Sequence, residues 1–495
     1  MSTSSVESQP VCRPARRWTM ASVIVLGVAA VLAVALVVGW YWRVAAGGTA
    51  GGEQAASAKV GEMRGGSDPG ALPEELRSPA EVLGLSPEVP ATVEALNEEA
   101  FVTCARLVAE LPHRPEAHAV AAFIYNRHGR NAEAARCWQK SLEVNPKFAA
   151  GYNGLGIVAA AQGENAKAIE YLRKAVELDP DLARAHSLLV EVLLRESKPE
   201  EARRAAEEYV KCVPRSGDSH YWLGQALLEL GRLAEAKNSH LEAVRIDPNY
   251  TPAYHSLAVI CARLGQRDEA RQYREKFAAM KERELEEERK QSRGYTDLET
   301  QAQLAASYHL AAGNVHLAFG DPRKAEAHWL RGAAIAPKST ACREALLEYY
   351  ERRNCIGSAL WQLDELLAIQ PANPTYWIRR GRLHARISDV EGAEAAFRKA
   401  VELAPESPDG YLSLVEFFLQ SRRKITETPA LAEKAVQRGP TVLAYMLLSA
   451  AREENKDRAG ALAAVEQALK LDPNNPQIRK LREQLQKSPL PKNAQ

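Results

Sequence analysis

Three arginines in the second half of the chain share one face of a predicted helix. In "YWIRRGRLHAR" (Tyr376 to Arg386), Arg379, Arg382 and Arg386 follow one another at intervals of three and four residues, which aligns them along a helix. A guanidinium group presents a fork of donors that binds a carboxylate bidentately. The spacing therefore predicts a surface that binds a carboxylate of a partner molecule.

Acidic residues 34 positions before or after an arginine could neutralise it, and they decide which of the three arginines can bind a partner. Glu348 and Glu416 stand at the level of Arg382, so we interpret Arg382 as part of a ladder of alternating charge. The levels of Arg379 and Arg386 hold no acid; their neighbours are Ala345, Ser413, Arg352 and Gln420. We therefore expect Arg379 and Arg386 to be free to bind a partner.

No catalytic, cofactor or metal motif accompanies these arginines. The chain contains no H-E-x-x-H, G-x-x-x-x-G-K-[ST], G-x-S-x-G or G-x-G-x-x-G sequence, and its seven cysteines form no C-x-x-C pair. A net charge of +1, from 64 basic and 63 acidic side chains, argues against binding to nucleic acid. We expect a protein that is not an enzyme, with no cofactor, metal or small-molecule substrate.

A repeat of 34 residues organises most of the chain. Prolines recur at this interval, and an alanine stands twelve residues before each; the prolines are Pro146, Pro180, Pro214, Pro248, Pro337, Pro371, Pro405 and Pro473. Such a period indicates a solenoid of small helical repeats. In residues 149–182, Tyr152, Leu155 and Ala159 mark one amphipathic helix, Gly163 breaks it, and a second helix ends before Pro180.

These repeats resemble the tetratricopeptide repeat family, whose 34-residue helix-turn-helix hairpins carry small residues at positions 8, 20 and 27 and proline at 32. The resemblance covers about four fifths of the chain and places a half-repeat at 91–114. The full repeats are 115–148, 149–182, 183–216, 217–250, 251–284, 306–339, 340–373, 374–407, 408–441 and 442–475. The repeat 408–441 has one extra residue and lacks the usual turn.

The resemblance implies an all-α, right-handed superhelical solenoid with a concave groove that binds a protein or peptide. Positions 6, 9 and 13 face this groove in the family, and they are the positions of Arg379, Arg382 and Arg386. The residues of the family's carboxylate-clamp and asparagine-ladder grooves are not assembled in this sequence.

Four histidines occupy position 4 of their repeats, where the family usually has an aromatic residue inside the hairpin. They are His118, His186, His220 and His309. Because they stand in different repeats, we expect them to pack rather than to converge on one metal ion.

The N-terminal region predicts a membrane anchor. Residues 21–42 carry no charge, and a helix of this length spans a bilayer core. Arg13, Arg16 and Arg17 precede this segment and only Arg43 follows closely, so residues 1–20 are expected in the cytoplasm. We interpret the segment as an uncleaved signal anchor; a cleavable signal peptide ending near Gly47 is the competing interpretation.

The remaining domain organisation follows from composition. Residues 43–79 are rich in Gly, Ala and Ser, which predicts a flexible linker. The further segments are a first repeat array at 80–284, a charged helical insert at 285–305, a second array at 306–475 and a C-terminal capping helix and tail at 476–495. In residues 281–290 we expect a helix that continues into solvent rather than a coiled-coil partner face.

Two binding functions fit this sequence. The first is a membrane-anchored scaffold, bound to the lipid bilayer through its N-terminal helix, that assembles a protein or peptide partner on the extracytoplasmic side. The second is a non-catalytic accessory subunit of an enzyme complex for envelope biogenesis, cytochrome maturation or polysaccharide export. In both, the protein is a single-pass inner-membrane protein with a periplasmic or extracytoplasmic repeat domain.

Overall fold

The computed structural model describes residues 79–294 and 297–487, and every regular element in them is a helix. The prediction of an all-α repeat structure is confirmed for this part of the chain. It divides after Ala336 into two compact units, the first unit (79–336) and the second unit (337–487).

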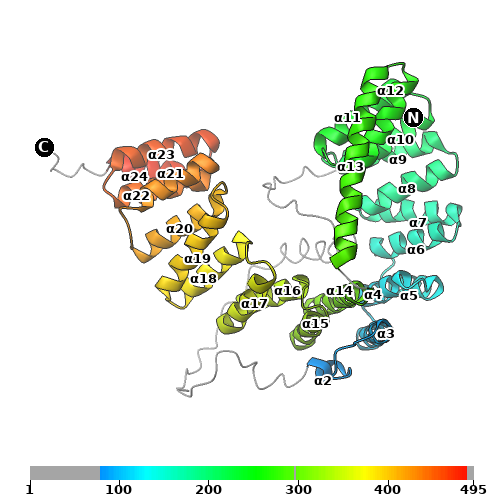
Figure 1. The fold of residues 1–495 in the computed structure, drawn as a ribbon, viewed down its shortest axis with the longest axis horizontal. Helices are drawn as coiled ribbons and strands as arrows, with labels where there is room; N and C mark the ends of the chain where they lie inside the picture. Colours follow the sequence, from blue (N-terminus) through cyan, green and yellow to red (C-terminus); the bar gives the residue numbers. More distant parts are fainter. Residues whose placement is uncertain (1–78, 295–296, 488–495) are drawn as a thin grey trace, which may run out of the picture. The chain divides into compact units, whose positions relative to one another are not determined.

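The first unit contains a short helix, a single long helix and six helical hairpins (Figure 1). Its helices are α2 (Pro79–Leu83), α3 (Val93–Glu110), α4 (Pro115–Arg127), α5 (Asn131–Val144), α6 (Ala149–Ala161), α7 (Asn165–Leu178), α8 (Ala183–Arg195), α9 (Pro199–Cys212), α10 (Gly217–Glu229), α11 (Leu233–Ile246), α12 (Thr251–Arg263), α13 (Arg267–Gly294), α14 (Asp297–Ala318) and α15 (Pro322–Ile335).

The second unit contains four hairpins and a final helix. Its helices are α16 (Ala341–Arg352), α17 (Ile356–Ile369), α18 (Pro374–Arg386), α19 (Val390–Leu403), α20 (Pro408–Ser421), α21 (Thr428–Arg438), α22 (Val442–Glu454), α23 (Arg458–Leu471) and α24 (Pro476–Lys487).

The two helices of a hairpin approach closely because a small residue of one faces a large side chain of the other. A Cβ atom on Gly156, at position 8 of its repeat, would lie 2.7 Å from the Leu172 side chain at position 24. Gly381 lies equally close to the ring of Phe397. The alanines at position 20 are fully buried; they are Ala134, Ala168, Ala202, Ala236, Ala270, Ala325, Ala359, Ala393 and Ala461. Larger side chains at these positions would separate the helices.

Position 15 adopts the left-handed backbone conformation in every repeat. Five repeats place glycine there: Gly129, Gly163, Gly231, Gly265 and Gly320. The other five have a residue with a side chain: Ser197, Asn354, Ser388, Arg422 and Lys456. The repeat 408–441 therefore has the turn after all, at Arg422, and its extra length lies between this turn and α21. Because a side chain disfavours this conformation, the turns without glycine are strained; they are the turns at Ser197, Asn354, Ser388, Arg422 and Lys456.

We predict that Lys456→Gly raises the free energy of unfolding by about 0.5–1 kcal/mol, since it removes the left-handed strain and Gly costs some chain entropy. The matched control is Gly231→Ala, where an added Cβ would meet no atom within 4 Å. Gly231→Ala should lower stability by about 1 kcal/mol. Thermal unfolding followed by circular dichroism measures both; a loss of stability in Lys456→Gly would contradict the strain.

The first row of hairpins ends at α13, which has a polar surface. α13 has 28 residues and its hairpin partner α12 has 13, so α13 reaches beyond α12 (Figure 1). Its continuation through residues 281–290 to Gly294 agrees with the predicted helical extension. Arg271 and Arg274 occupy positions 21 and 24, where the repeat 149–182 has the buried Ile169 and Leu172. α13 thus lacks the apolar face onto which another hairpin could stack.

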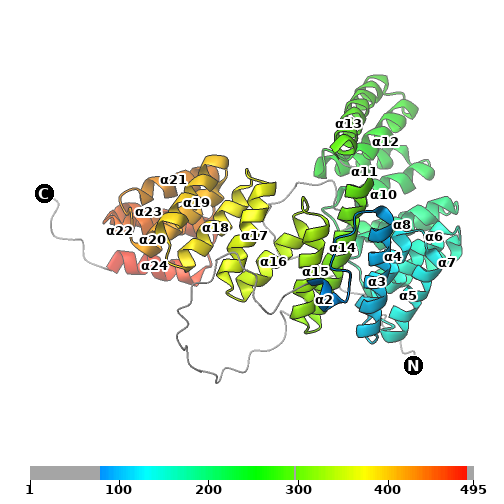
Figure 2. The same ribbon diagram turned by 60° about the horizontal axis from the view of Figure 1, so that its bottom comes forward.

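The α14/α15 hairpin instead joins the opposite end of the first unit. α14 contacts α3 and α4, and α15 contacts α2 (Figures 1 and 2). Cys104 and Leu107 of α3 share a core with Tyr308, Ala312 and Val315 of α14. α14 therefore supplies the first helix that the half-repeat containing α3 lacks.

This arrangement differs from the division expected at 285–305. The compact units meet at residue 336, so α14 and α15 belong with the helices of the first array and the second unit begins with α16. The physical reason is the pairing of α14 with α3, which is nearly 200 residues away in sequence and which neighbour-to-neighbour stacking does not anticipate.

We predict that a chain ending after Ala336 retains the stability of the first unit, whereas a chain ending after Gly294 loses at least about 3 kcal/mol. The shorter chain removes Arg331 from the buried carboxylate of Glu99, with which it forms an ion pair at 2.7 Å, and exposes the apolar face of α3. Urea unfolding measures the difference. Equal midpoints and slopes for the two chains would refute the pairing of α14 with α3.

The predicted anchor at 21–42 lies outside the described residues. Among the described helices, none has both the length and the hydrophobicity required to cross a bilayer.

Candidate functional site

α18 places the three predicted arginines on its solvent side. Asn373 caps the helix by accepting a hydrogen bond from the backbone N–H of Thr375, and Pro374 occupies its first turn. The opposite side is fixed because Gly381 lies against the ring of Phe397 and Leu383 is buried. The rotation of α18 therefore leaves Arg382 and Arg386 exposed.

Arg379 is neutralised by an acid of the preceding hairpin. Its Nε donates to Oε1 of Glu351 at 3.1 Å, and its Nη2 donates to Oε2 of the same carboxylate. Arg386 donates to the backbone oxygen of Glu351 at 3.5 Å and to Oδ1 of Asn354. The expectation that Arg379 and Arg386 lack partners is therefore wrong for Arg379; Arg386 binds neutral acceptors and keeps an uncompensated charge.

Arg382 is the free guanidinium of this group. It is exposed, and within the described structure it has no hydrogen bond or ion pair. Glu348 instead pairs with Arg352, and Glu416 accepts a hydrogen bond from Gln420. The interpretation of Arg382 as part of a charge ladder is wrong, because each of these acids binds a residue four positions along its own helix.

A second group of polar side chains lies between α3, α14 and α15, at what we call the junction. Nε and Nη2 of Arg331 donate to the two carboxylate oxygens of Glu99 at 2.8 and 2.7 Å, and both residues are buried. Arg331 also donates to the backbone oxygens of Pro87 and Glu88 at 3.5 and 2.7 Å. One guanidinium thus joins α15, α3 and the segment that follows α2.

The charge of Glu99 is stabilised inside the junction. Nε2 of His309 donates to Oε1 of Glu99 at 3.1 Å. Burial alone would raise the pKa of Glu99, but the hydrogen bonds from Arg331 and His309 hold it at about 2. Glu99 is therefore a carboxylate at neutral and at mildly acidic pH.

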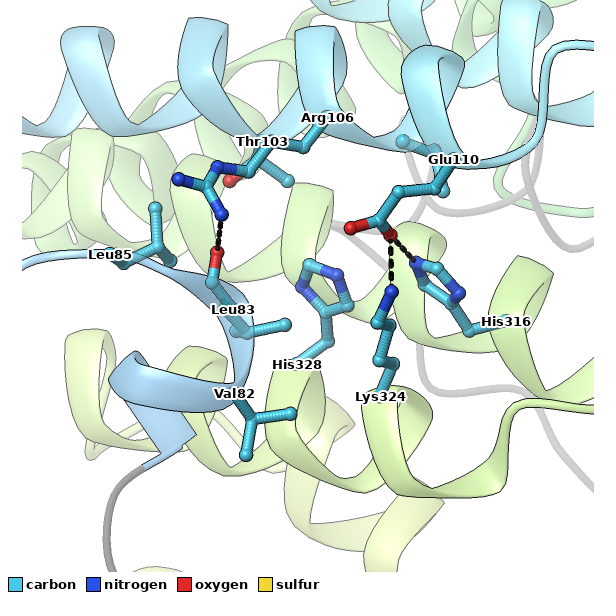
Figure 3. A pocket seen from close by; sticks show the side chains of 10 residues that line it. Val82, Leu83, Leu85, Thr103, Arg106, Glu110, His316, Lys324 and His328 are labelled. Atoms are coloured by element: carbon cyan, nitrogen blue, oxygen red, sulfur yellow. Dashed lines mark hydrogen bonds and ion pairs between the residues drawn. The ribbon is translucent and has the colours of Figure 1, made fainter.

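A small pocket opens between α3 and the α14/α15 hairpin, with Arg106 and Glu110 on one wall and His316, Lys324 and His328 facing them (Figure 3). Arg106 donates to the backbone oxygen of Leu83 at 2.7 Å, which fixes the end of α2 over the pocket. Glu110 lies 3.0 Å from Nζ of Lys324 and 3.5 Å from Nε2 of His316. The cavity volume is about 10 Å³, which admits about one water molecule.

The sequence did not single out the junction. Its polar groups come from α3, α14 and α15, and only His309 had been considered, as a packing residue. The described residues contain no group of three or more histidine, cysteine or acidic side chains that could hold a metal ion.

Comparison with protein families decides the identity of the repeats. Family models described as tetratricopeptide repeat match more than half of the chain, at residues 125–183, 188–251, 251–272, 306–331, 342–408 and 442–475. The chain belongs to the tetratricopeptide repeat (TPR) family. No curated protein matches it.

Several solved structures resemble parts of this TPR protein. A crystal structure of MamA has 25% sequence identity, covers 33% of this chain and 96% of its own, and gives a TM-score of 0.31. YrrB, described as a TPR protein with an unusual peptide-binding site, has 19% sequence identity. The match covers 36% of this chain and 91% of YrrB, with a TM-score of 0.31. PilF of Pseudomonas aeruginosa has 22% sequence identity. The match covers 47% of this chain and 97% of PilF, with a TM-score of 0.30.

Position 4 of the TPR repeats has a common structural role. Nε2 of His118 and of His186 donates to the backbone oxygen of the proline six residues earlier, each at 2.9 Å, and His220 makes the same contact at 3.2 Å. Tyr254 and Trp377 do so with a hydroxyl and an indole N–H. The packing role predicted for His118 and His186 agrees with their burial, whereas His220 is only half-buried.

His309 makes a different contact at position 4. α14 begins at Asp297, nine residues before its repeat, so a helix replaces the turn that carries the accepting proline elsewhere. His309 binds Glu99 and His328 instead. Position 4 thus binds the turn before the helix in several hairpins, whereas in the α14/α15 hairpin it binds α3.

Proposed function

We propose that this protein is a membrane-anchored TPR scaffold that binds a protein or peptide partner along the inner row of its hairpin helices. The partner carries a carboxylate that contacts Arg382 and Arg386, and the repeat domain lies on the extracytoplasmic side of the membrane.

The arrangement of the hairpins supports an inner binding surface. In the first unit the first helices of successive hairpins contact one another, as α4 with α6, α6 with α8, α8 with α10, and α10 with α12. In the second unit α18 contacts α20 and α20 contacts α22. Helices that touch across repeats form the inner layer of a curved stack, so an extended partner there meets several repeats at once.

The exposed guanidinium of Arg382 is the observation that carries the proposal. It stands on α18, a helix of the inner row, and the acids nearest to it in the repeat pattern are already paired within their own helices. Arg386 lies one turn further and contacts neutral acceptors. Two uncompensated guanidiniums on one helix face suit a carboxylate, which each can bind with two hydrogen bonds.

The anchor rests on the sequence of residues 21–42 and on the arginines that precede it. An uncharged segment of this length partitions into the bilayer core, and the positive charges favour a cytoplasmic N-terminus. The flexible composition of residues 43–79 would let the repeats reach a partner away from the membrane.

We predict that protease added outside spheroplasts degrades the repeat domain and that the mature chain keeps its N-terminal residues. Mass spectrometry of the purified chain identifies the N-terminus, and immunoblotting of intact and lysed spheroplasts reports accessibility. Repeats protected in intact spheroplasts would contradict the extracytoplasmic location, and an N-terminus near Gly47 would contradict the uncleaved anchor.

We predict that Arg382→Glu combined with Arg386→Ala lowers recovery of the cognate partner in a crosslinked pull-down by at least tenfold, because each charge-assisted hydrogen bond contributes about 1.5–3 kcal/mol. The melting temperature should fall little, since neither side chain is part of an ion pair and the hydrogen bonds that Arg386 makes are exposed. The matched control is Arg379→Ala, which should lower stability by about 1 kcal/mol by unpairing Glu351. Unchanged recovery from the stable double variant would remove this site.

A further inference from the structure

Three imidazole rings form a continuous cluster at the junction of α3 with the α14/α15 hairpin. Nδ1 of His328 lies 3.0 Å from Nδ1 of His309, and the ring of His328 stacks on that of His316 with centroids 5.3 Å apart. All three residues are buried, with exposed fractions of 1% for His309, 2% for His316 and 5% for His328. α14 carries two of the rings and α15 the third, at the side of the hairpin that meets α3.

The hydrogen bonds fix where the protons are. The carboxylate of Glu99 only accepts, so Nε2 of His309 carries a proton and Nδ1 of neutral His309 is an acceptor. While His309 is neutral, Nδ1 of His328 is the donor of this bond. If both rings took up a second proton, two N–H groups would face each other at 3.0 Å and the bond would be lost. The observed contact therefore excludes full protonation of the pair.

The charged groups around the rings cannot absorb more positive charge. α3 contributes Glu99, Glu110 and Arg106, and α15 contributes Lys324 and Arg331. The two carboxylates of α3 are already bound, to Arg331 and to Lys324, and the third nearby acid, Asp321 at the start of α15, lies 3.9 Å from Lys324.

On the far side of α14, Arg127 of α4 and His128, which follows α4, lie against Tyr308. Each further proton thus adds uncompensated charge to a buried region, where such charge is costly.

We propose that this histidine cluster is a proton-sensitive latch, in which proton uptake at mildly acidic pH releases the α14/α15 hairpin from α3. The closed latch covers the face of α3 that carries Cys104 and Leu107, and the open latch exposes it. The latch controls the α14/α15 hairpin, which packs on helices that lie far from it in the sequence.

The direction of the pH dependence follows from linkage. Burial is the main cause that lowers the pKa of His328 well below 6.5 and that also lowers the pKa of His316. In the open state both rings reach water and regain a pKa near 6.5. The open state therefore binds more protons, and the closed latch loses stability as the pH falls below about 6.5.

The test is amide hydrogen exchange of the full-length protein in detergent, read by mass spectrometry for peptides of α3, α14 and α10–α11. If His316 and His328 both stay neutral in the closed state, the opening constant derived from α3 and α14 should rise about 100-fold between pH 7.5 and 5.5. The control peptides of α10–α11 contain His240, which is buried and has its pKa lowered to about 4. They report acid destabilisation elsewhere in the unit.

The decisive variant is His328→Asn, because the amide N–H can still donate to His309 but does not titrate. It should reduce the rise at α3 and α14 to about tenfold, since one titrating ring remains, and leave the response of α10–α11 unchanged. If the variant opens already at pH 7.5, His316→Asn takes its place with the same expectation. No change at α3 and α14 in the wild-type protein, or an equal rise in the variants, would overturn the proposal.

Modification of Cys104 provides a second measurement. Cys104 lies in the core between α3 and α14, whereas Cys261 is buried in α12 of the same unit, and Cys355 is exposed. Labelling rates divided by that of Cys355 remove much of the intrinsic pH dependence of the thiol reaction. Acid should raise the normalised rate at Cys104 more than at Cys261; an equal rise would mean that the whole unit opens rather than the latch.

Discussion

The close approach of two helix backbones within each hairpin is the constraint on which the rest of this structure depends. Gly224 faces His240 and Gly313 faces Trp329 so closely that a Cβ atom on either glycine would lie about 2.5 Å from the opposing ring. Each pair combines a residue without a side chain at position 8 with a large one at position 24, and the total volume fits. In the repeat 183–216 the sizes are reversed: the larger residue, Val190, is at position 8 and the smaller, Ala206, is at position 24. Both are fully buried, so the two helices pack equally closely. The distance between the two helices thus depends on the summed volume of the residues at positions 8 and 24 rather than on their identity.

Identical hairpins would stack without limit, so the ends of a row need residues that stop it. α13 supplies such an end in the first unit through its polar surface. α3 is the opposite case, since its apolar residues Leu96, Ala100 and Leu107 require a partner helix and share cores with residues of α14. α14 meets that requirement, and the polarity of α13 and the hydrophobicity of α3 together explain why α14 packs where it does.

Local periodicity made most of the fold predictable. The period of 34 located the hairpins, the alanines at position 20 and the ends of the helices before proline, because each depends on residues within one repeat. The place of the α14/α15 hairpin was not predictable, since it depends on a contact between residues 99 and 331. The arginines of α18 show the same limit: Arg379 binds Glu351, which stands at position 12 of the preceding repeat rather than at the level of position 6. A long side chain reaches diagonally across a groove, and level-by-level comparison misses the pair.

The buried ion pair of Glu99 and Arg331 selects one partner for α3 among many similar helices. Hydrophobic contacts alone would let α3 pair with several first helices of the array, because these have similar apolar faces. A buried carboxylate destabilises every such arrangement unless a cation and further donors reach it. Arg331 and His309 supply these donors only when the α14/α15 hairpin lies against α3. The pair therefore contributes more to the specificity of the arrangement than to its net stability, and the histidines beside it make that specificity depend on protons.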